Sequence, residues 1–175
     1  TARVELVGRR GTLLEQLTRL NKSAVTAPPP AQRGSAGDLS APVATPPELE
    51  FFNGVGGFGS DGREYVTILR TGQSTPAPWI NVIANPSFGF QVAVEGGGYT
   101  WSGNSRENKL TPWSNDPVSD DPGEVIYVHD EESGDLWGPT ALPIRDASGS
   151  YIARHGQGYS RFEHTRHGIV LDLVQ

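Results

Sequence analysis

Residues 88–101 read FGFQVAVEGGGYTW, and this stretch decides the fold class. Phe88, Phe90, Val92 and Val94 occupy alternate positions, which places them on one face of a half-buried β-strand. Three glycines follow, and the residues from Gly98 to Trp101 again suit a strand. The stretch is therefore predicted to form two consecutive strands.

The sequence on both sides repeats this pattern of short strand-like runs separated by Gly, Pro, Asn and Asp. The other candidate strands are residues 63–70, 79–84, 125–130, 150–155, 159–164 and 169–174. No helical period is evident among them, and the glycine clusters lie between strands, so they do not suit a nucleotide-binding loop. Many short strands with turn residues between them predict an all-β domain, an antiparallel sandwich or barrel.

Composition limits the class of protein further. The 175 residues include no Cys and no Met, and no apolar run approaches the roughly 20 residues of a membrane helix. The lack of Cys excludes disulfides and thiol catalysis. A chain that starts at Thr1 and contains no Met is expected to be a water-soluble piece of a longer polypeptide.

Charge divides the chain into three segments. Residues 1–22 have a net charge of +3 and predict a strand and a helix, which either ends an upstream domain or docks on the sheet that follows. Residues 23–47 contain six Pro and six Ala and predict an extended linker. Residues 48–175 carry eight basic and 17 acidic groups, so the β-domain has a net charge of −9. Such a surface repels phosphate backbones, which disfavours nucleic acid as a partner.

The densest polar and aromatic stretch is the long predicted loop at residues 99–121. Loops of this length are uncommon in compact β-domains unless they are functional or disordered, and aromatic residues argue against disorder. Aromatic rings together with Asn, Asp, Glu and Arg form the mixture that binds sugars. Trp101 and Trp113 also suit packing of the loop on its own sheet. The residues that favour an exposed or interface role are Asn104, Arg106 and Glu107.

The sequence gives less support to a catalytic site or a metal site. A glycosidase needs two carboxylates about 5 to 9.5 Å apart, but Asp116 and Asp121 each precede a proline and suit turns. His164 and His167 are three residues apart, and strand residues at that spacing face opposite sides. We therefore predict no catalytic residue, no metal and no cofactor in this chain. Arg161 and the stretch Arg154–His155–Gly156 are expected instead to be cross-strand partners for the acidic loops.

Six longer motifs carry a resemblance to a known family. They are FNGVGGF (52–58), DGREY (61–65), PAPWINVIANP (76–86), GYTW (98–101), NSRENKLTPWSNDPV (104–118) and RHGQGY (154–159). Together they resemble the amino-terminal β-sandwich of glycoside hydrolase family 94, formerly glycosyltransferase family 36, and most of all the bacterial cyclic β-1,2-glucan synthases in it. The resemblance runs from about Glu48 to the end of the chain.

The resemblance, to which residues 1–47 do not contribute, implies an antiparallel twisted β-sandwich of the galactose-mutarotase-like supersandwich type over residues 48–175, shortened at its C-terminus. The strand and helix predicted for residues 1–22 would form a short appendage before it. The resemblance also implies a module that is inactive alone and frames the active site of an (α/α)6 barrel, in a parent enzyme on the cytoplasmic side of the bacterial inner membrane. Its implied partners are that barrel, a β-glucan oligosaccharide and a second copy in a homodimer. An independent glucan-binding module and a purely structural or dimerisation domain remain as alternatives. The candidate substrate-binding or domain-interface residues are Trp101, Asn104, Ser105, Arg106, Glu107, Asn108 and Trp113.

Overall fold

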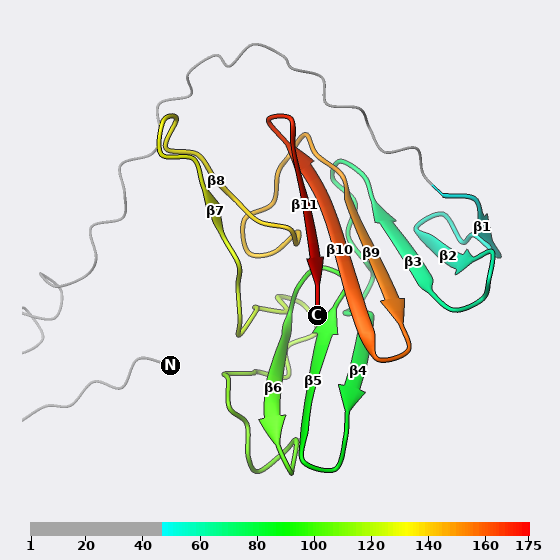
Figure 1. The fold of residues 1–175 in the computed structure, drawn as a ribbon, viewed down its shortest axis with the longest axis vertical. Helices are drawn as coiled ribbons and strands as arrows, with labels where there is room; N and C mark the ends of the chain where they lie inside the picture. Colours follow the sequence, from blue (N-terminus) through cyan, green and yellow to red (C-terminus); the bar gives the residue numbers. More distant parts are fainter. Residues whose placement is uncertain (1–46) are drawn as a thin grey trace, which may run out of the picture. The chain divides into compact units, whose positions relative to one another are not determined.

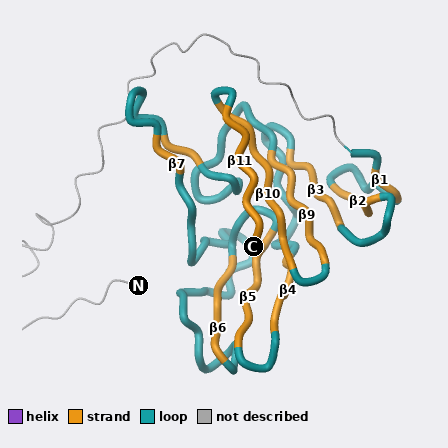
Figure 2. The backbone as a smooth tube through the Cα atoms, in the orientation of Figure 1, coloured by secondary structure: helices purple, strands orange, loops and turns teal. Residues whose placement is uncertain are grey.

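The computed structural model describes residues 47–175, so the predicted appendage and nearly all of the linker lie outside the described residues. Residues 47–175 form eleven strands and no helix; none of them, accordingly, belongs to a helix that could cross a membrane. The strands build three sheets, and each strand pair is antiparallel (Figure 1, Figure 2). The prediction of an all-β, antiparallel domain is confirmed.

Six strands form the larger sheet, in the order β1-β2-β3-β9-β10-β11. Their bounds are Leu49–Glu50 (β1), Gly56–Gly59 (β2), Tyr65–Leu69 (β3), Tyr151–Gly156 (β9), Tyr159–Arg166 (β10) and Ile169–Val174 (β11). The smaller sheet consists of β4 (Ile80–Ala84), β5 (Phe88–Ala93) and β6 (Gly98–Ser102). A two-stranded ribbon pairs β7 (Val128–His129) with β8 (Leu136–Trp137). The smaller sheet and the ribbon thus lie in the chain between β3 and β9, which are neighbours in the larger sheet.

The main core joins the two larger sheets. Phe162 of β10 and Ala153 of β9 are buried in one cluster with Val92 of β5, and Phe90 packs against the same cluster. Asn81 of β4 adds a polar connection, because its side-chain nitrogen lies 2.9 Å from the carbonyl oxygens that flank the β9–β10 turn. These contacts hold the smaller sheet in a fixed position on the β9–β10 hairpin.

The predicted strand at residues 88–94 is present as β5, but the prediction that its alternate side chains are all buried is only partly correct. Val92 and Val94 are buried, but Phe88 is 46% exposed. Phe88 begins β5 next to the β4–β5 turn, where the smaller sheet extends past the end of the β9–β10 hairpin (Figure 1). Its side of the sheet therefore has no strand opposite it at that point.

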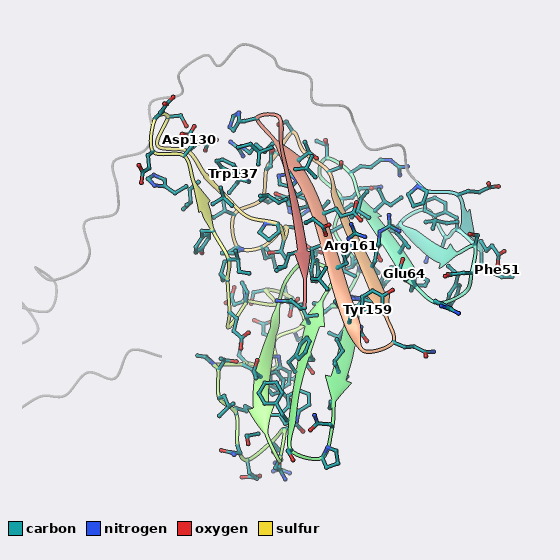
Figure 3. All side chains as sticks on the ribbon, in the orientation of Figure 1. Phe51, Glu64, Asp130, Trp137, Tyr159 and Arg161 are labelled. Atoms are coloured by element: carbon teal, nitrogen blue, oxygen red, sulfur yellow. The ribbon has the colours of Figure 1, made fainter. Side chains whose placement is uncertain are left out.

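The other face of the larger sheet carries a row of ion pairs. Arg161 binds both carboxylate oxygens of Asp172, at 2.7 and 2.6 Å, and Arg154 binds Glu163 at 2.8 Å. Glu64 accepts a hydrogen bond from the Tyr159 hydroxyl at 2.6 Å, and Figure 3 shows these side chains on the same part of the sheet. The expected cross-strand pairing of Arg161 is correct, but the expectation that its partner comes from an acidic loop is wrong, because Asp172 belongs to the adjacent strand.

Gly89 provides a test of the packing on the smaller sheet. A Cβ atom at Gly89 would lie 2.5 Å from the Trp101 ring and 2.7 Å from the Ala84 Cβ. We expect Gly89→Ala to lower the free energy of unfolding by about 1–3 kcal/mol, as overpacking does, in urea denaturation. Gly59→Ala is the matched control in a strand, because its Cβ would meet its nearest atom at an ordinary 3.5 Å. Equal effects of the two substitutions would contradict the close approach of Trp101.

Candidate functional site

The candidate site is the tip loop, Gly103–Asn108, which directly follows β6. The Asn104 side-chain oxygen accepts the backbone N–H groups of Arg106 and Glu107 at 2.9 and 3.0 Å. The Asn108 N–H donates to the Asn104 carbonyl at 3.0 Å, and the Asn108 side-chain amide donates to the carbonyl of the last β6 residue at 2.9 Å. Both asparagine side chains are therefore used to fold the loop, as in other Asx turns.

A neighbouring turn fixes the base of the tip loop. Gly103 has a φ of +65°, a left-handed conformation that glycine adopts without strain, and its N–H donates to the Ser87 carbonyl at 2.8 Å. Ser87 belongs to the β4–β5 turn, where the Asn85 side-chain oxygen accepts the N–H groups of Ser87 and Phe88. Each turn thus contains an asparagine cap, and one hydrogen bond joins the two turns.

An aromatic row supports the tip loop. Trp101 is only 7% exposed, and the Tyr99 ring lies 5.2 Å from it and stacks on Trp113 at 4.7 Å. The Tyr99 hydroxyl donates to the Ser105 carbonyl at 3.2 Å. The Lys109 ammonium lies 5.1 Å from the Trp113 ring centroid and 5.8 Å from that of Tyr99, close enough for cation–π attraction. The rings therefore contact one another and the loop rather than an open surface.

Arg106 and Glu107 are the two candidates whose charged groups face solvent. Their side chains are 89% and 74% exposed, and the only ion pair found for them among the described residues is with each other, at 3.2 Å. An exposed ion pair of this kind is worth little and is easily exchanged for other partners. The structure thus separates the seven candidates into residues that build the loop and two charged side chains that the loop presents.

Lys109 was missed as a member of the site because a lysine beside a loop usually indicates only a solvated surface. An isolated antiparallel β-bridge pairs Lys109 with Trp101. The loop therefore runs beside the outer edge of β6 at this point. The position of Lys109 four residues before Trp113 was the available signal, but spacing in a loop does not define contacts. The pairing with β6 supplies that information.

Asp120 closes the long loop against the turn between β5 and β6. A Cβ at Gly97 would lie 2.3 Å from the Asp120 carboxylate, so the absence of a side chain at Gly97 makes room for Asp120. Burial, with smaller contributions from the charges of Glu95 and Asp121, raises the pKa of Asp120 to about 6. Arg145 pairs with Glu95, not with Asp120. A carboxyl group in this state can mark a functional site, but here it contacts backbone and lines none of the three cavities described next.

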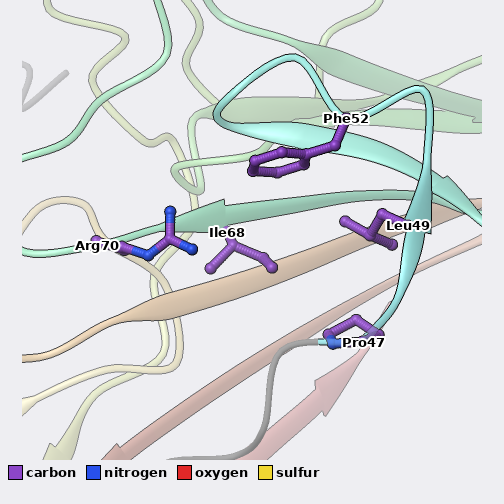
Figure 4. Close-up of a pocket in the computed structure, with 5 residues that line it drawn as sticks. All are labelled: Pro47, Leu49, Phe52, Ile68 and Arg70. Atoms are coloured by element: carbon purple, nitrogen blue, oxygen red, sulfur yellow. The ribbon is translucent and has the colours of Figure 1, made fainter.

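Three of the cavities in the described part of the chain each offer few catalytic groups. One of about 260 Å³ is mainly apolar and is shown in Figure 4; Pro47, Leu49, Phe52, Ile68 and Arg70 line it. Two others, of about 20 and 120 Å³, share Glu124 as their only carboxylate. None of the three therefore contains the pair of carboxylates that glycoside hydrolysis requires.

The predicted separation of His164 from His167 agrees with their contacts. His164 is buried, stacks on Tyr151 at 4.1 Å and lies 2.9 Å from the Ser150 carbonyl, and burial lowers its pKa. His167 instead lies 2.7 Å from Asp135. Among residues 47–175, no three His, Cys, Asp or Glu side chains converge to hold a metal ion.

Comparison with known proteins identifies the family. Residues 63–174 match the model described as the glycosyl hydrolase 94, supersandwich domain. The chain belongs to glycoside hydrolase family 94. The tip loop and its aromatic row lie inside the matched residues, so the candidate site is part of the family 94 domain.

The relatives are much longer than this chain. The chain is 50% identical over 127 residues to the cyclic beta-(1,2)-glucan synthase NdvB of Rhizobium meliloti, a match that covers 73% of the chain and 4% of the relative. It is 36% identical over 119 residues to N,N'-diacetylchitobiose phosphorylase of Vibrio furnissii, covering 66% and 14%. It is 33% identical over 118 residues to solabiose phosphorylase of Paenibacillus borealis, covering 66% and 15%. The family 94 domain described here thus corresponds to a small part of each of these enzymes.

Trp113 tests whether the aromatic row supports the tip loop. Trp113→Ala removes the stack on Tyr99 and the contact with Lys109. Because Trp113 is half-buried, we expect the free energy of unfolding to fall by about 1–3 kcal/mol, below the full cost of a buried aromatic. Amide exchange of Arg106 and Glu107 should become faster. Leu110→Ala, at an exposed neighbour, should change stability by less than about 0.5 kcal/mol; an unchanged Trp113→Ala stability would refute the supporting role.

The raised pKa of Asp120 predicts that the stability of the folded chain depends on pH. Its pKa is about 6 in the folded chain, whereas the ordinary value is 3.8. Between these pH values the folded state therefore binds more protons than the unfolded state does. Its contribution to stability is therefore largest below about pH 4 and is lost as the pH rises through 6. Asp120→Asn should remove this loss and stabilise the chain at pH 7, measured by urea unfolding between pH 4 and 7. The exposed Glu131→Gln should keep the wild-type slope; an Asp120→Asn variant with that same slope would contradict the assignment.

Proposed function

We propose that this domain is a non-catalytic module of a larger family 94 enzyme, and that the tip loop contacts another part of that enzyme beside its sugar-binding site. One observation carries the proposal: Arg106 and Glu107 stand exposed on a loop whose conformation is already fixed. A guanidinium and a carboxylate held in place can bind hydroxyls or polar groups with defined geometry. The module would occupy residues from about 48 onward, which is consistent with β1 starting at Leu49.

The distribution of acidic groups supports a role without independent catalysis. Asp116 accepts hydrogen bonds from the N–H of Val118 and the hydroxyl of Ser119, which lower its pKa, as in a capped turn. Asp120 contacts backbone, and Glu124 is the only carboxylate at its cavities. The catalytic groups would then come from another region of the parent chain, which the family resemblance implies is an (α/α)6 barrel.

The substrate class follows from the relatives. The relative that is 50% identical is a cyclic beta-(1,2)-glucan synthase, and the other two are phosphorylases, so we infer a β-glucan oligosaccharide as the ligand of the parent enzyme. Tyr99 and Trp113 stack on each other and Lys109 lies over both rings, so the rings offer a sugar little open face, and the groups that the tip loop exposes are the charges of Arg106 and Glu107. This favours a contact within the assembled enzyme over an independent glucan-binding module.

Substitutions in the intact parent enzyme test this function. Arg106→Ala and Glu107→Gln should each lower glucan turnover by about 10-fold, as expected for loss of a hydrogen bond to a charged group. Both should leave the unfolding midpoint of the 175-residue chain unchanged, because the two side chains are exposed. Arg63→Ala removes an exposed arginine on the β2–β3 turn and is the matched control for charge. Normal turnover by both tip-loop variants would refute the proposed contact.

A further inference from the structure

Asn53 and Gly54 lie in the turn that joins β1 to β2, and this pair of residues is chemically labile. Asn53 is the only asparagine in the 175 residues that a glycine follows. Glycine has no side chain to shield its backbone nitrogen, so this nitrogen can attack the side-chain carbonyl carbon of the asparagine before it. Both residues are exposed, so water and base reach them. The reaction therefore depends on whether the folded chain leaves the Asn53 side chain free to rotate onto Gly54.

Hydrogen bonds hold both polar atoms of the Asn53 side chain. The carbonyl oxygen accepts the backbone N–H groups of Val55 and Gly56 at 3.0 and 2.9 Å. The amide nitrogen donates to the Tyr65 hydroxyl of β3 at 3.1 Å. The carboxamide has to give up these bonds in order to rotate onto the Gly54 nitrogen and to release ammonia. The folded turn thus opposes the reaction.

The attacking nitrogen of Gly54, by contrast, is not held. No backbone acceptor is found for its N–H among residues 47–175, and a Cβ atom at Gly54 would have nothing within 4 Å. Its φ of +99° is a conformation that glycine adopts without strain. The contacts of the Asn53 side chain are therefore what keeps the two reacting groups apart.

The Tyr65 hydroxyl is positioned by packing that does not involve Asn53. The Tyr65 ring meets the Phe58 ring edge-on at 5.1 Å and the Trp79 ring at 6.1 Å. A Cβ atom at Gly56 would lie 2.9 Å from the Tyr65 ring, so the missing side chain makes room for it. Opening of the β1–β2 turn, rather than motion of Tyr65, accordingly sets the rate at which Asn53 reacts.

We propose that Asn53 is a self-modification site, which reacts only while the β1–β2 turn is open and whose isoaspartate product cannot close the turn again. The Gly54 nitrogen forms a bond to the Asn53 Cγ, the Cγ–Nδ2 bond breaks, and the proton of the Gly54 N–H leaves with the amide group as ammonia. Water then opens the resulting ring at either carbonyl, which gives aspartate or isoaspartate. This site is independent of the role of the tip loop.

The isoaspartate product releases β1 from the larger sheet. It adds one atom to the backbone and has no side-chain N–H for the Tyr65 hydroxyl, so the hydrogen bonds of the turn no longer match. Leu49 of β1 packs on the buried cluster of Val66, Ile68 and Ile152. Loss of the turn uncovers this cluster, and because ammonia has left, the change is permanent.

The test compares the folded and the urea-unfolded 175-residue chain at mildly alkaline pH. Mass spectrometry of the peptide that contains Asn53 measures deamidation, and enzymatic methylation identifies isoaspartate. The folded chain should react at least about 10-fold more slowly, because the hydrogen bonds of the carboxamide have to break first. The ratio of the two rates should match the open fraction that NMR amide exchange gives for Val55 and Gly56, since one opening frees these N–H groups and the Asn53 side chain together.

Two tyrosine variants test the contact with β3. Tyr65→Phe keeps the ring and removes one hydrogen bond of Asn53, so it should speed the reaction of the folded chain by about 3-fold and leave the unfolded rate unchanged. Tyr159→Phe is the matched control, because it removes a hydroxyl of the same sheet that is bonded to Glu64, and it should react at the rate of the unaltered chain. The purified isoaspartate form should lose amide protection in β2 and keep it in β9 and β10.

Four outcomes overturn the proposal. They are a folded chain that reacts as fast as the unfolded one, a rate ratio that differs from the open fraction, equal rates for Tyr65→Phe and Tyr159→Phe, and an isoaspartate form that keeps the protection of β2. If Tyr65→Phe does not fold, as judged by circular dichroism, the match between deamidation and amide exchange in the unaltered chain decides alone.

Discussion

The contact of the Trp101 ring with the backbone of Gly89 is the constraint on which the candidate site depends. Gly89 is paired with Trp101 across β5 and β6, and its missing side chain is the space that the indole fills. Tyr99 lies two residues before Trp101 on the same face, so its ring is held beside the indole, where Trp113 can stack on it. The return path of the long loop, and with it the position of the tip loop, follows from this one close approach.

The same contact explains how a three-stranded sheet is covered on both sides. One face of β5 carries Phe90 and Val92 into the core shared with β9 and β10, and the opposite face is covered at β6 by the aromatic row. Asn81 then connects β4 to the β9–β10 turn through partly buried polar contacts. The tip loop is consequently bonded to a sheet that itself packs on the larger sheet.

The sequence contained the strand pattern and the position of the long loop, because both depend on residues close together in the chain. Alternation identified β5, and the aromatic content of residues 99–121 identified the loop. β2 was missed because its residues are mostly glycine: buried Gly56 lies against the Tyr65 ring and has no pattern of its own. The partner of Arg161 was wrong because it depends on the register of β10 and β11. The use of Asn104 and Asn108 within the loop could not be separated from ligand binding by composition, since the same amides serve both purposes.

A fixed loop with free charges has a thermodynamic advantage for contact with another domain. Ordering a flexible loop on binding costs roughly 0.5–1.5 kcal/mol for each immobilised side chain, besides the backbone. Here the asparagine caps, the Tyr99 hydroxyl and the Ser87 carbonyl have already fixed the backbone of the tip loop. The pair between Arg106 and Glu107 is almost fully solvated, so separating the two costs little. The remaining cost of binding is the restriction of two side chains and the loss of their water, which one or two charge-assisted hydrogen bonds can offset. That balance suits a contact made inside an assembled enzyme, where the partner is held nearby, better than the capture of a free sugar from solution.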